Sequence, residues 1–238
     1  MLENLPQYIS LVFSFTVIAT LILFFLIIFN SKDFSNKSNA IILFLTLWLI
    51  LQMILSFYNF YNSDTLSFPP RFLILILPPL LTIIILFSTQ SGKTFIDGLP
   101  IFYLTLLNIV RVPVEIVLYW LFLNKAVPEI MTFNGNNFDI LSGITAPIIA
   151  YWGLHKKLFN KKIILLWNFI ALGLLLNIVF TAIFSAPFSF QKFAFEQPNI
   201  AVLFFPFSWL PAFIVPVVLF CHLASIRQLI KPRNESSN

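Results

Sequence analysis

The sequence predicts an all-α, polytopic membrane protein built as a seven-transmembrane-helix bundle. The composition, with 59% hydrophobic and 10% charged residues, lies far from the roughly 25% charged residues of a soluble domain. The mean hydropathy is +0.94. Seven apolar runs approach or exceed the roughly 17–25 residues that cross a bilayer, and short connections join them into a single transmembrane domain, 1–238. The runs are 8–29, 40–61, 71–88, 99–123, 139–155, 163–185 and 200–226.

The first run, 8–29, is too long for a cleaved signal peptide and lacks both a basic leader and a small-residue cleavage site. We therefore expect it to stay in the protein as a signal anchor. The second run, 40–61, places Gln52, Ser56 and Asn59 on one helical face. These side chains are expected to bond to neighbouring helices, or to complete a polar site.

Proline in four of the runs predicts bends at several depths. Membrane helices accept proline when neighbouring groups bond to the carbonyl that it frees, four residues earlier. In the last run these carbonyls belong to Val202, Phe207 and Ala212, and they predict either a ladder of acceptors or a bent packing helix. The prolines are Pro78, Pro79, Pro113, Pro147, Pro206, Pro211 and Pro216.

The fourth run, 99–123, carries a polar stripe. Asn108, Arg111, Glu115 and Tyr119 recur at intervals of three and four residues, so they share one face of a helix. A charged side chain at bilayer depth costs at least about 2.5–3.5 kcal/mol on insertion scales. The stripe must therefore face the bundle interior or a wet cavity.

Two interpretations of the stripe remain open. In the first, Arg111 receives an anionic or strongly polar group while Glu115 balances its charge or accepts a proton. In the second, the two charges form a structural ion pair that sets the helix register. Asp139 and Asn177, from the fifth and sixth runs, lie toward the outer half, where Glu115 points. The candidate substrate-binding residues are Arg111, Glu115, Asn108, Tyr119, Asp139 and Asn177.

The connection from Lys125 to Asp139 is rich in turn formers and amide side chains. Together with the aromatic segment 187–199 it could roof an outward-opening vestibule. The alternative is an ordinary interfacial connector.

The distribution of the 14 Lys and Arg residues predicts an outside N-terminus and a cytoplasmic C-terminus. Arg71, Lys125 and Lys192 fall on the opposite, outer side. The same bias attributes the net charge of +5 to topology and lipid headgroups and excludes a nucleic-acid partner. The cytoplasmic set is Lys32, Lys37, Lys93, Lys156, Lys157, Lys161, Lys162, Arg227, Lys231 and Arg233.

Several kinds of site are excluded. Two histidines and one cysteine, Cys221, give no ligand spacing for a metal, and no cofactor is expected. The segment from Ser91 to Thr94 resembles the end of a phosphate-binding loop, but Phe87 stands where that motif requires glycine. We expect a cytoplasmic loop there. The last run has no lysine for a retinal Schiff base.

Three classes of function stay open. The first is a small-solute carrier or binding protein that uses the polar stripe for a small polar or anionic ligand. The second is a non-catalytic membrane subunit or sensor that needs a membrane protein partner. The third is an intramembrane enzyme acting on a lipid or isoprenoid, which the scarcity of histidines and carboxylates disfavours. The expected location is a cell membrane, the bacterial inner membrane first, with the lipid bilayer as partner.

Overall fold

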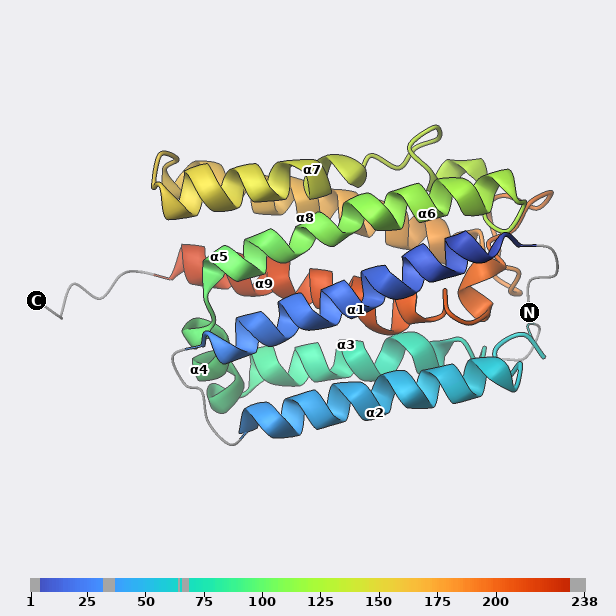
Figure 1. Cartoon of the computed structure of the whole chain (residues 1–238), viewed down its shortest axis with the longest axis horizontal. Coiled ribbons are helices and arrows are strands. Elements are labelled where there is room, and N and C mark those ends of the chain that lie inside the picture. Colours follow the sequence, from blue (N-terminus) through green and yellow to red (C-terminus); the bar gives the residue numbers. More distant parts are fainter. Residues whose placement is uncertain (1–4, 32–36, 64, 66–68, 232–238) are drawn as a thin grey trace, which may run out of the picture.

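A computed structural model describes residues 5–31, 37–63, 65 and 69–231. The regular elements among these residues are all helices, so the predicted all-α class is confirmed. The long helices lie side by side along the longest axis of the molecule (Figure 1). The elements are α1 (Gln7–Phe29), α2 (Lys37–Phe57), α3 (Leu73–Ser88), α4 (Gln90–Gly98), α5 (Ile101–Leu106), η1 (Leu107–Val110), α6 (Arg111–Leu123), η2 (Glu129–Met131), α7 (Ile140–Ile148), η3 (Ile149–His155), α8 (Lys161–Phe184), η4 (Ala201–Leu203), η5 (Leu210–Ile214) and α9 (Val215–Ile230).

Five of these helical stretches are long and apolar enough to cross a membrane. The pair α3 and α4, bent by 93°, becomes a sixth candidate if it is counted as one broken span. Ile140–His155 is apolar but shorter. A multi-pass membrane protein is therefore supported with five or six spans, and a seventh remains a prediction. The five stretches are Gln7–Phe29, Asn39–Phe57, Ile101–Leu123, Lys161–Phe184 and Leu210–Ile230.

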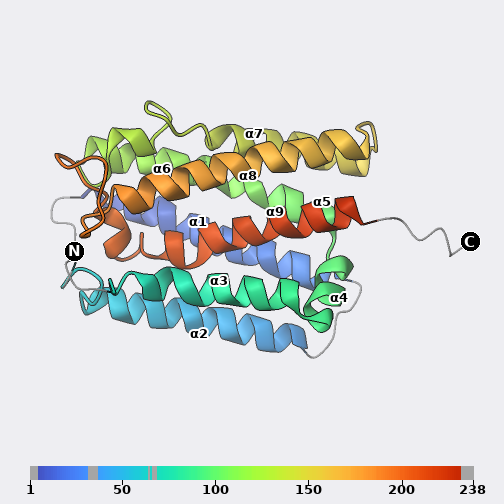
Figure 2. The ribbon, with the colours of Figure 1, turned by 180° about the vertical axis from the view of Figure 1, so that it is seen from behind.

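The helix formed by η5 and α9 lies at the centre of the bundle, whereas α2 lies at its edge. In its most apolar window, 61% of Leu210–Ile230 is buried, against 17% of Asn39–Phe57. Figure 2 shows α9 between α8 and α3, with α1 behind it. Aromatic contacts join these helices, as where the ring centroids of Phe24 of α1 and Phe220 of α9 lie 6.1 Å apart.

The helices change their winding near Pro113, Pro147 and Pro211, whereas Pro78 and Pro79 lie inside the α-helix α3. The 3₁₀ segment η1 ends directly before Arg111, and Pro113 lies in the first turn of α6. A π-helical segment, η3, follows Pro147 closely, and a second one, η5, contains Pro211. Such segments occur where the regular hydrogen-bond ladder is interrupted, often at functional sites.

The structure corrects three of the predicted boundaries. The segment from Ser91 to Thr94 is part of α4 instead of a loop, because the Thr89 side chain caps this helix by accepting from the Gly92 N–H at 3.2 Å. Residues 58–61 follow α2 as turns. The last apolar run becomes a long helix only at Leu210, after η4 and a turn around Pro206.

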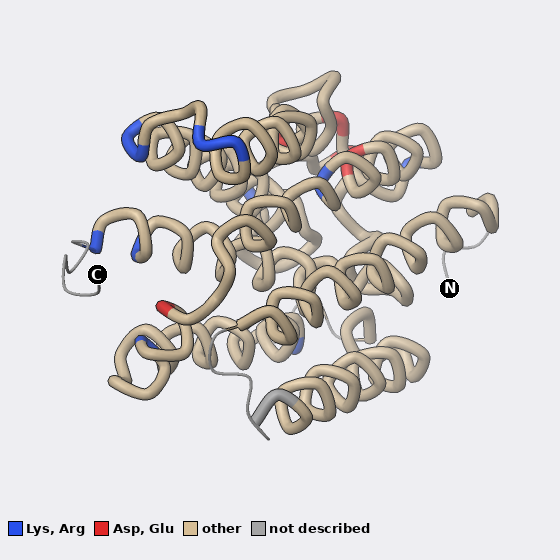
Figure 3. The backbone as a smooth tube through the Cα atoms, turned by 60° about the vertical axis from the view of Figure 1, so that its left-hand side comes forward, with Lys and Arg blue, Asp and Glu red and all other residues tan. Residues whose placement is uncertain are grey.

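Ion pairs tie α4 to the C-terminal end of α9. Arg227 donates to both carboxylate oxygens of Asp97 at 2.8 and 2.9 Å, and Lys231 donates to the same group at 2.7 Å. Most Lys and Arg positions gather at this end (Figure 3). Partial burial alone would raise the pKa of Asp97, but these two cations outweigh it and hold the pKa below its ordinary value of 3.8.

Replacing Asp97 with asparagine is expected to lower the free energy of unfolding by about 1 kcal/mol, because the contact is only partly shielded from solvent. Since the folded-state pKa is lowered, this contribution is present at neutral pH and is lost as the pH falls below about 4. Thermal unfolding in detergent at pH 7 and at low pH measures both effects. Glu196→Gln, which changes an exposed acid, serves as the control. A loss from Asp97→Asn that persists unchanged at low pH would contradict the explanation.

Candidate functional site

Arg111 lies in the interior of the bundle, 2% exposed, and its partner is Asp139. Nη1 of Arg111 lies 3.2 Å from Oδ1 of Asp139. Both terminal nitrogens of Arg111 also donate to the backbone carbonyl of Ala171 on α8, at 3.2 Å. Arg111 therefore joins α6 to the start of α7 and to the middle of α8.

Glu115, one turn further along α6, is bound by Asn137 instead of by Arg111. The Asn137 side-chain amide donates to both carboxylate oxygens at 2.7 and 2.6 Å, and to the Met131 carbonyl at 3.0 Å. The Asn137 side-chain oxygen accepts from the Asp139 N–H at 3.0 Å. Asn137 thus links the Glu115 carboxylate to the backbone of Asp139, and Glu115 and Asn137 are both almost completely buried.

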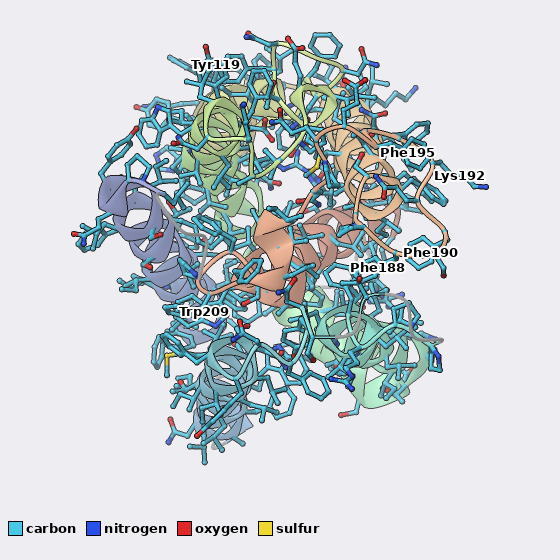
Figure 4. The ribbon with its side chains drawn as sticks, turned by 90° about the vertical axis from the view of Figure 1, so that its right-hand side faces the viewer. Tyr119, Phe188, Phe190, Lys192, Phe195 and Trp209 are labelled. Carbon is cyan, nitrogen blue, oxygen red and sulfur yellow. The ribbon has the colours of Figure 1, made fainter. Side chains whose placement is uncertain are left out.

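Four of the six predicted site residues are buried together, and two lie at the edge. Asn108 is buried one turn before Arg111 and donates within its own helix to Leu104 and Thr105. Tyr119 is half-buried and stacks on Phe133 with ring centroids 4.8 Å apart. Figure 4 shows Tyr119 at the periphery of the bundle. Asn177 is exposed and donates to the Asn136 carbonyl at 3.0 Å.

Sequence reasoning did not select Asn137, the residue that holds Glu115. It lies two positions before Asp139, in the amide-rich connection that sequence reasoning did single out as a whole. The pair Asn168 and His222, which joins α8 to α9 with 3.0 Å between Oδ1 and Nδ1, was also missed as a pair. Neither pairing has a spacing signal, because its members come from separate elements.

The polar cluster contains several buried atoms without a hydrogen-bond partner in the described part of the chain. We use the name polar cluster for Asn108, Arg111, Glu115, Asn137, Asp139, Ser142, Asn168 and His222. Buried polar groups are nearly always paired, so unpaired ones indicate a bound water, ion or ligand. The unpaired atoms are Asn108 Oδ1, Arg111 Nε, Asp139 Oδ1, Ser142 Oγ and His222 Nε2.

A large cavity lies elsewhere, between α2, α3, α4 and the central helix. Its volume is about 1120 Å³, and none of the residues of the polar cluster lines it. Its walls are mainly aliphatic and aromatic. The lining residues include Ile41, Phe44 and Trp48 of α2, Pro78, Thr82 and Leu86 of α3, Thr89, Ser91 and Thr94 of α4, and Phe213, Pro216 and Phe220 of the central helix.

The cavity exists because α2 is fastened along one half only. Trp48 donates to the Ala212 carbonyl at 3.0 Å, and Trp209 donates to the Leu49 carbonyl at 3.0 Å. Further along, Ser56 bonds to Ser208 at 2.7 Å. Within the described residues, the hydrogen bonds from α2 to other elements begin at Trp48. The earlier part of α2 lines the cavity with Ala40, Ile41, Phe44 and Leu45.

These bonds also show what holds one of the carbonyls freed by proline and two of the polar side chains on α2. Pro216 frees the carbonyl of Ala212, and this acceptor is taken by Trp48. Gln52 accepts from the Tyr61 hydroxyl, and Ser56 bonds to Ser208, so both side chains tie α2 to neighbouring segments. Gln52 and Ser56, on the polar face of α2, therefore hold this helix against its neighbours.

The two predicted outer segments do lie together. Gln197 donates to the carbonyls of Phe122 and Val127 at 3.0 and 2.6 Å, and the N–H groups of Ile200 and Ala201 donate to Ala126. Figure 4 shows Phe188, Phe190, Lys192 and Phe195 at this end of the bundle. Phe188 is 4% exposed and packs in the core, whereas Phe195 is 71% exposed.

The chain matches no family model, no curated protein and no solved structure in the comparisons made with it. What the polar cluster and the cavity can do therefore follows from their own chemistry.

Proposed function

We propose that this multi-pass membrane protein is a carrier or binding protein for a molecule with a long apolar chain, which occupies the cavity between α2, α3, α4 and the central helix. The cavity carries this proposal. At about 1120 Å³ it is somewhat larger than the roughly 300–1000 Å³ of typical ligand pockets. It is lined by side chains of α1, α2, α3, α4, η5 and α9, so its ligand would come from the bilayer.

The chemistry of the walls supports an apolar ligand. Among the described residues, none that lines the cavity is charged, and most of the polar side chains there already make hydrogen bonds. Thr82 and Thr94 donate to carbonyls of their own helices at 2.9 and 3.1 Å, Thr89 caps α4, and Trp48 donates to Ala212. A strongly polar solute would lose its hydration there and gain few hydrogen bonds. An acyl or isoprenoid chain has no hydrogen bonds with water to lose on entering the cavity.

The proposal includes a seven-helix topology with the N-terminus outside. Ile140–His155 is the additional span, and α4 lies across the cytoplasmic end of α3. The helix ends support this orientation, because Lys93, Lys161 and Lys231 belong to elements that meet at one end of the bundle. Positive charge accumulates on the cytoplasmic side of short loops. We propose a bacterial inner membrane as the location.

The polar cluster favours a second candidate function, a small-solute site on α6. Arg111, Glu115, Asn108 and Asp139 would contact a small polar ligand, with Tyr119 and Asn177 at its outer edge. Asn108 Oδ1 and Arg111 Nε, which have no hydrogen-bond partner among the described residues, support this alternative. The apolar cavity remains the first candidate because it offers volume for a ligand.

Filling the cavity is expected to weaken ligand binding at least about tenfold. Ile41→Trp places a larger side chain in the cavity wall, whereas Leu43→Trp makes a similar change on the exposed face of the same helix. Affinity for a fluorescent long-chain fatty acid, measured with protein in detergent, should fall only in Ile41→Trp. Mass spectrometry of lipids that copurify with each variant provides a second measurement. Equal affinity in both variants would overturn the proposal.

A further inference from the structure

The polar cluster holds more buried negative than positive charge. Glu115 is 1% exposed and Asp139 is 4% exposed, against a single buried cation, Arg111. The other titratable groups that face Arg111 are Cys221 and His222 of α9. From α8 the described contacts are a backbone carbonyl and the neutral side chain of Asn168. The described cations of these two helices do not balance the second carboxylate: Lys161 and Lys162 are exposed in the first turn of α8, and Arg227 pairs with Asp97.

One ion pair cannot neutralise two carboxylates. Arg111 compensates Asp139, with which it is in contact, and reaches Glu115 only at longer range. The Asn137 amide stabilises Glu115 by two hydrogen bonds but brings no charge. An isolated buried carboxylate is too costly to persist, so it binds a cation or takes up a proton.

Oxygen atoms that could receive such a cation are present. Oδ1 of Asp139 contacts Arg111 without hydrogen-bond geometry, and Oγ of Ser142 and Oδ1 of Asn108 have no partner among the described residues. All three residues are more than nine-tenths buried. They lie where the helices are irregular, beside the 3₁₀ segment η1 and at the start of α7. Interrupted helices beside charged groups are the usual setting of Na⁺ and proton sites in carriers.

We infer that the polar cluster is a buried binding site for one monovalent cation, a proton or Na⁺, which neutralises the carboxylate that Arg111 leaves unbalanced. The two carboxylates and the guanidinium carry a net charge of −1, which one monovalent cation balances. This site does not depend on the apolar cavity, which other residues form. It can therefore be present whether or not the cavity binds a lipid.

The experiment measures the thermal stability of purified protein in detergent under two series of conditions. In the first, NaCl replaces N-methylglucamine chloride at constant pH and ionic strength. In the second, pH is varied at constant Na⁺. The variant is Glu115→Gln, which removes one charge and keeps an oxygen for Asn137. The control is Glu129→Gln, which removes an exposed carboxylate from the same connection.

A Na⁺ site predicts a rise of about 3–6 °C in the melting temperature for each tenfold increase in Na⁺ above the dissociation constant. A proton site predicts that stability falls as the pH rises, because the carboxyl group then loses its proton and leaves an unbalanced negative charge in the apolar core. In Glu115→Gln the response is lost, and in Glu129→Gln it is kept. A melting temperature of the parent protein that changes with neither Na⁺ nor pH overturns the inference. A change in melting temperature that persists in Glu115→Gln also overturns it.

A second variant and a spectroscopic measurement cover the case in which Glu115→Gln does not fold. Asp139→Asn also leaves one carboxylate for one guanidinium, so it should abolish the same response. Infrared spectroscopy of the parent protein detects the carbonyl band of a buried protonated carboxyl group directly. Its presence at neutral pH assigns the cation as a proton. If this band is absent and the melting temperature of the parent protein does not change with Na⁺, the inference is overturned without any variant.

Discussion

Replacing Arg111 with methionine is expected to lower the free energy of unfolding by about 3–5 kcal/mol, the usual cost of removing one partner from a buried ion pair. Asp139 and Glu115 would then both remain in the interior without a positive charge. The Ala171 carbonyl would also lose the two donors that hold α8 against α6. Unfolding in mixed detergent and SDS micelles, followed by circular dichroism, measures the change.

Two comparison variants make this prediction specific. Lys192→Met removes an exposed cation and should change the stability by less than about 0.5 kcal/mol. Combining Arg111→Met with Glu115→Gln and Asp139→Asn removes all three charges, so it should recover part of the loss. A single variant that is as stable as the parent would show that the guanidinium is not needed to hold the two carboxylates.

Replacing Gly143 with alanine is expected to lower the free energy of unfolding by about 1–3 kcal/mol through overpacking. Gly143 lies on the face of α7 that meets the first turn of α6. A Cβ atom there would lie 2.9 Å from the backbone nitrogen of Val112 and 3.1 Å from Cβ of Arg111. The two helices would have to separate, and Arg111 would move relative to Asp139. The same unfolding measurement detects the loss.

Gly173 of α8 provides the matched control for Gly143. A Cβ atom at Gly173 meets nothing within 4 Å. Gly173→Ala should therefore raise the stability by about 0.5–1 kcal/mol, since alanine favours the helix. Similar losses in both variants would contradict the explanation by close helix approach.

Much of the fold could be predicted from local signals, and the failures have local causes. The runs that contain α1, α2 and α8 were located to within a few residues, because long apolar stretches leave a backbone few alternatives to helix. The sharp bend between α3 and α4 was missed, since the capping role of Thr89 depends on one side-chain hydrogen bond. The late start of the last helix follows from Pro206 and Pro211, whose combined effect on the chain direction was not evident from spacing.

The candidate site was predicted in part. The stripe on α6 required Arg111 and Glu115 to face inward, and both do. The stripe also suggested that these two residues pair with each other. In the folded chain the nearest partner of each comes from the connection before α7, Asp139 for Arg111 and Asn137 for Glu115.

By itself, the sequence determined that this chain is helical, that it belongs in a membrane, and that the charged face of the fourth run turns away from lipid. These properties depend on composition and on periodicity within one segment, which folding does not alter. Only the tertiary structure decided which acid meets Arg111, and that α2 separates from its neighbours to leave an apolar cavity. Both depend on how closely particular helices approach, as at Gly143 and Trp48, and such distances between separate segments leave no periodic pattern in the sequence.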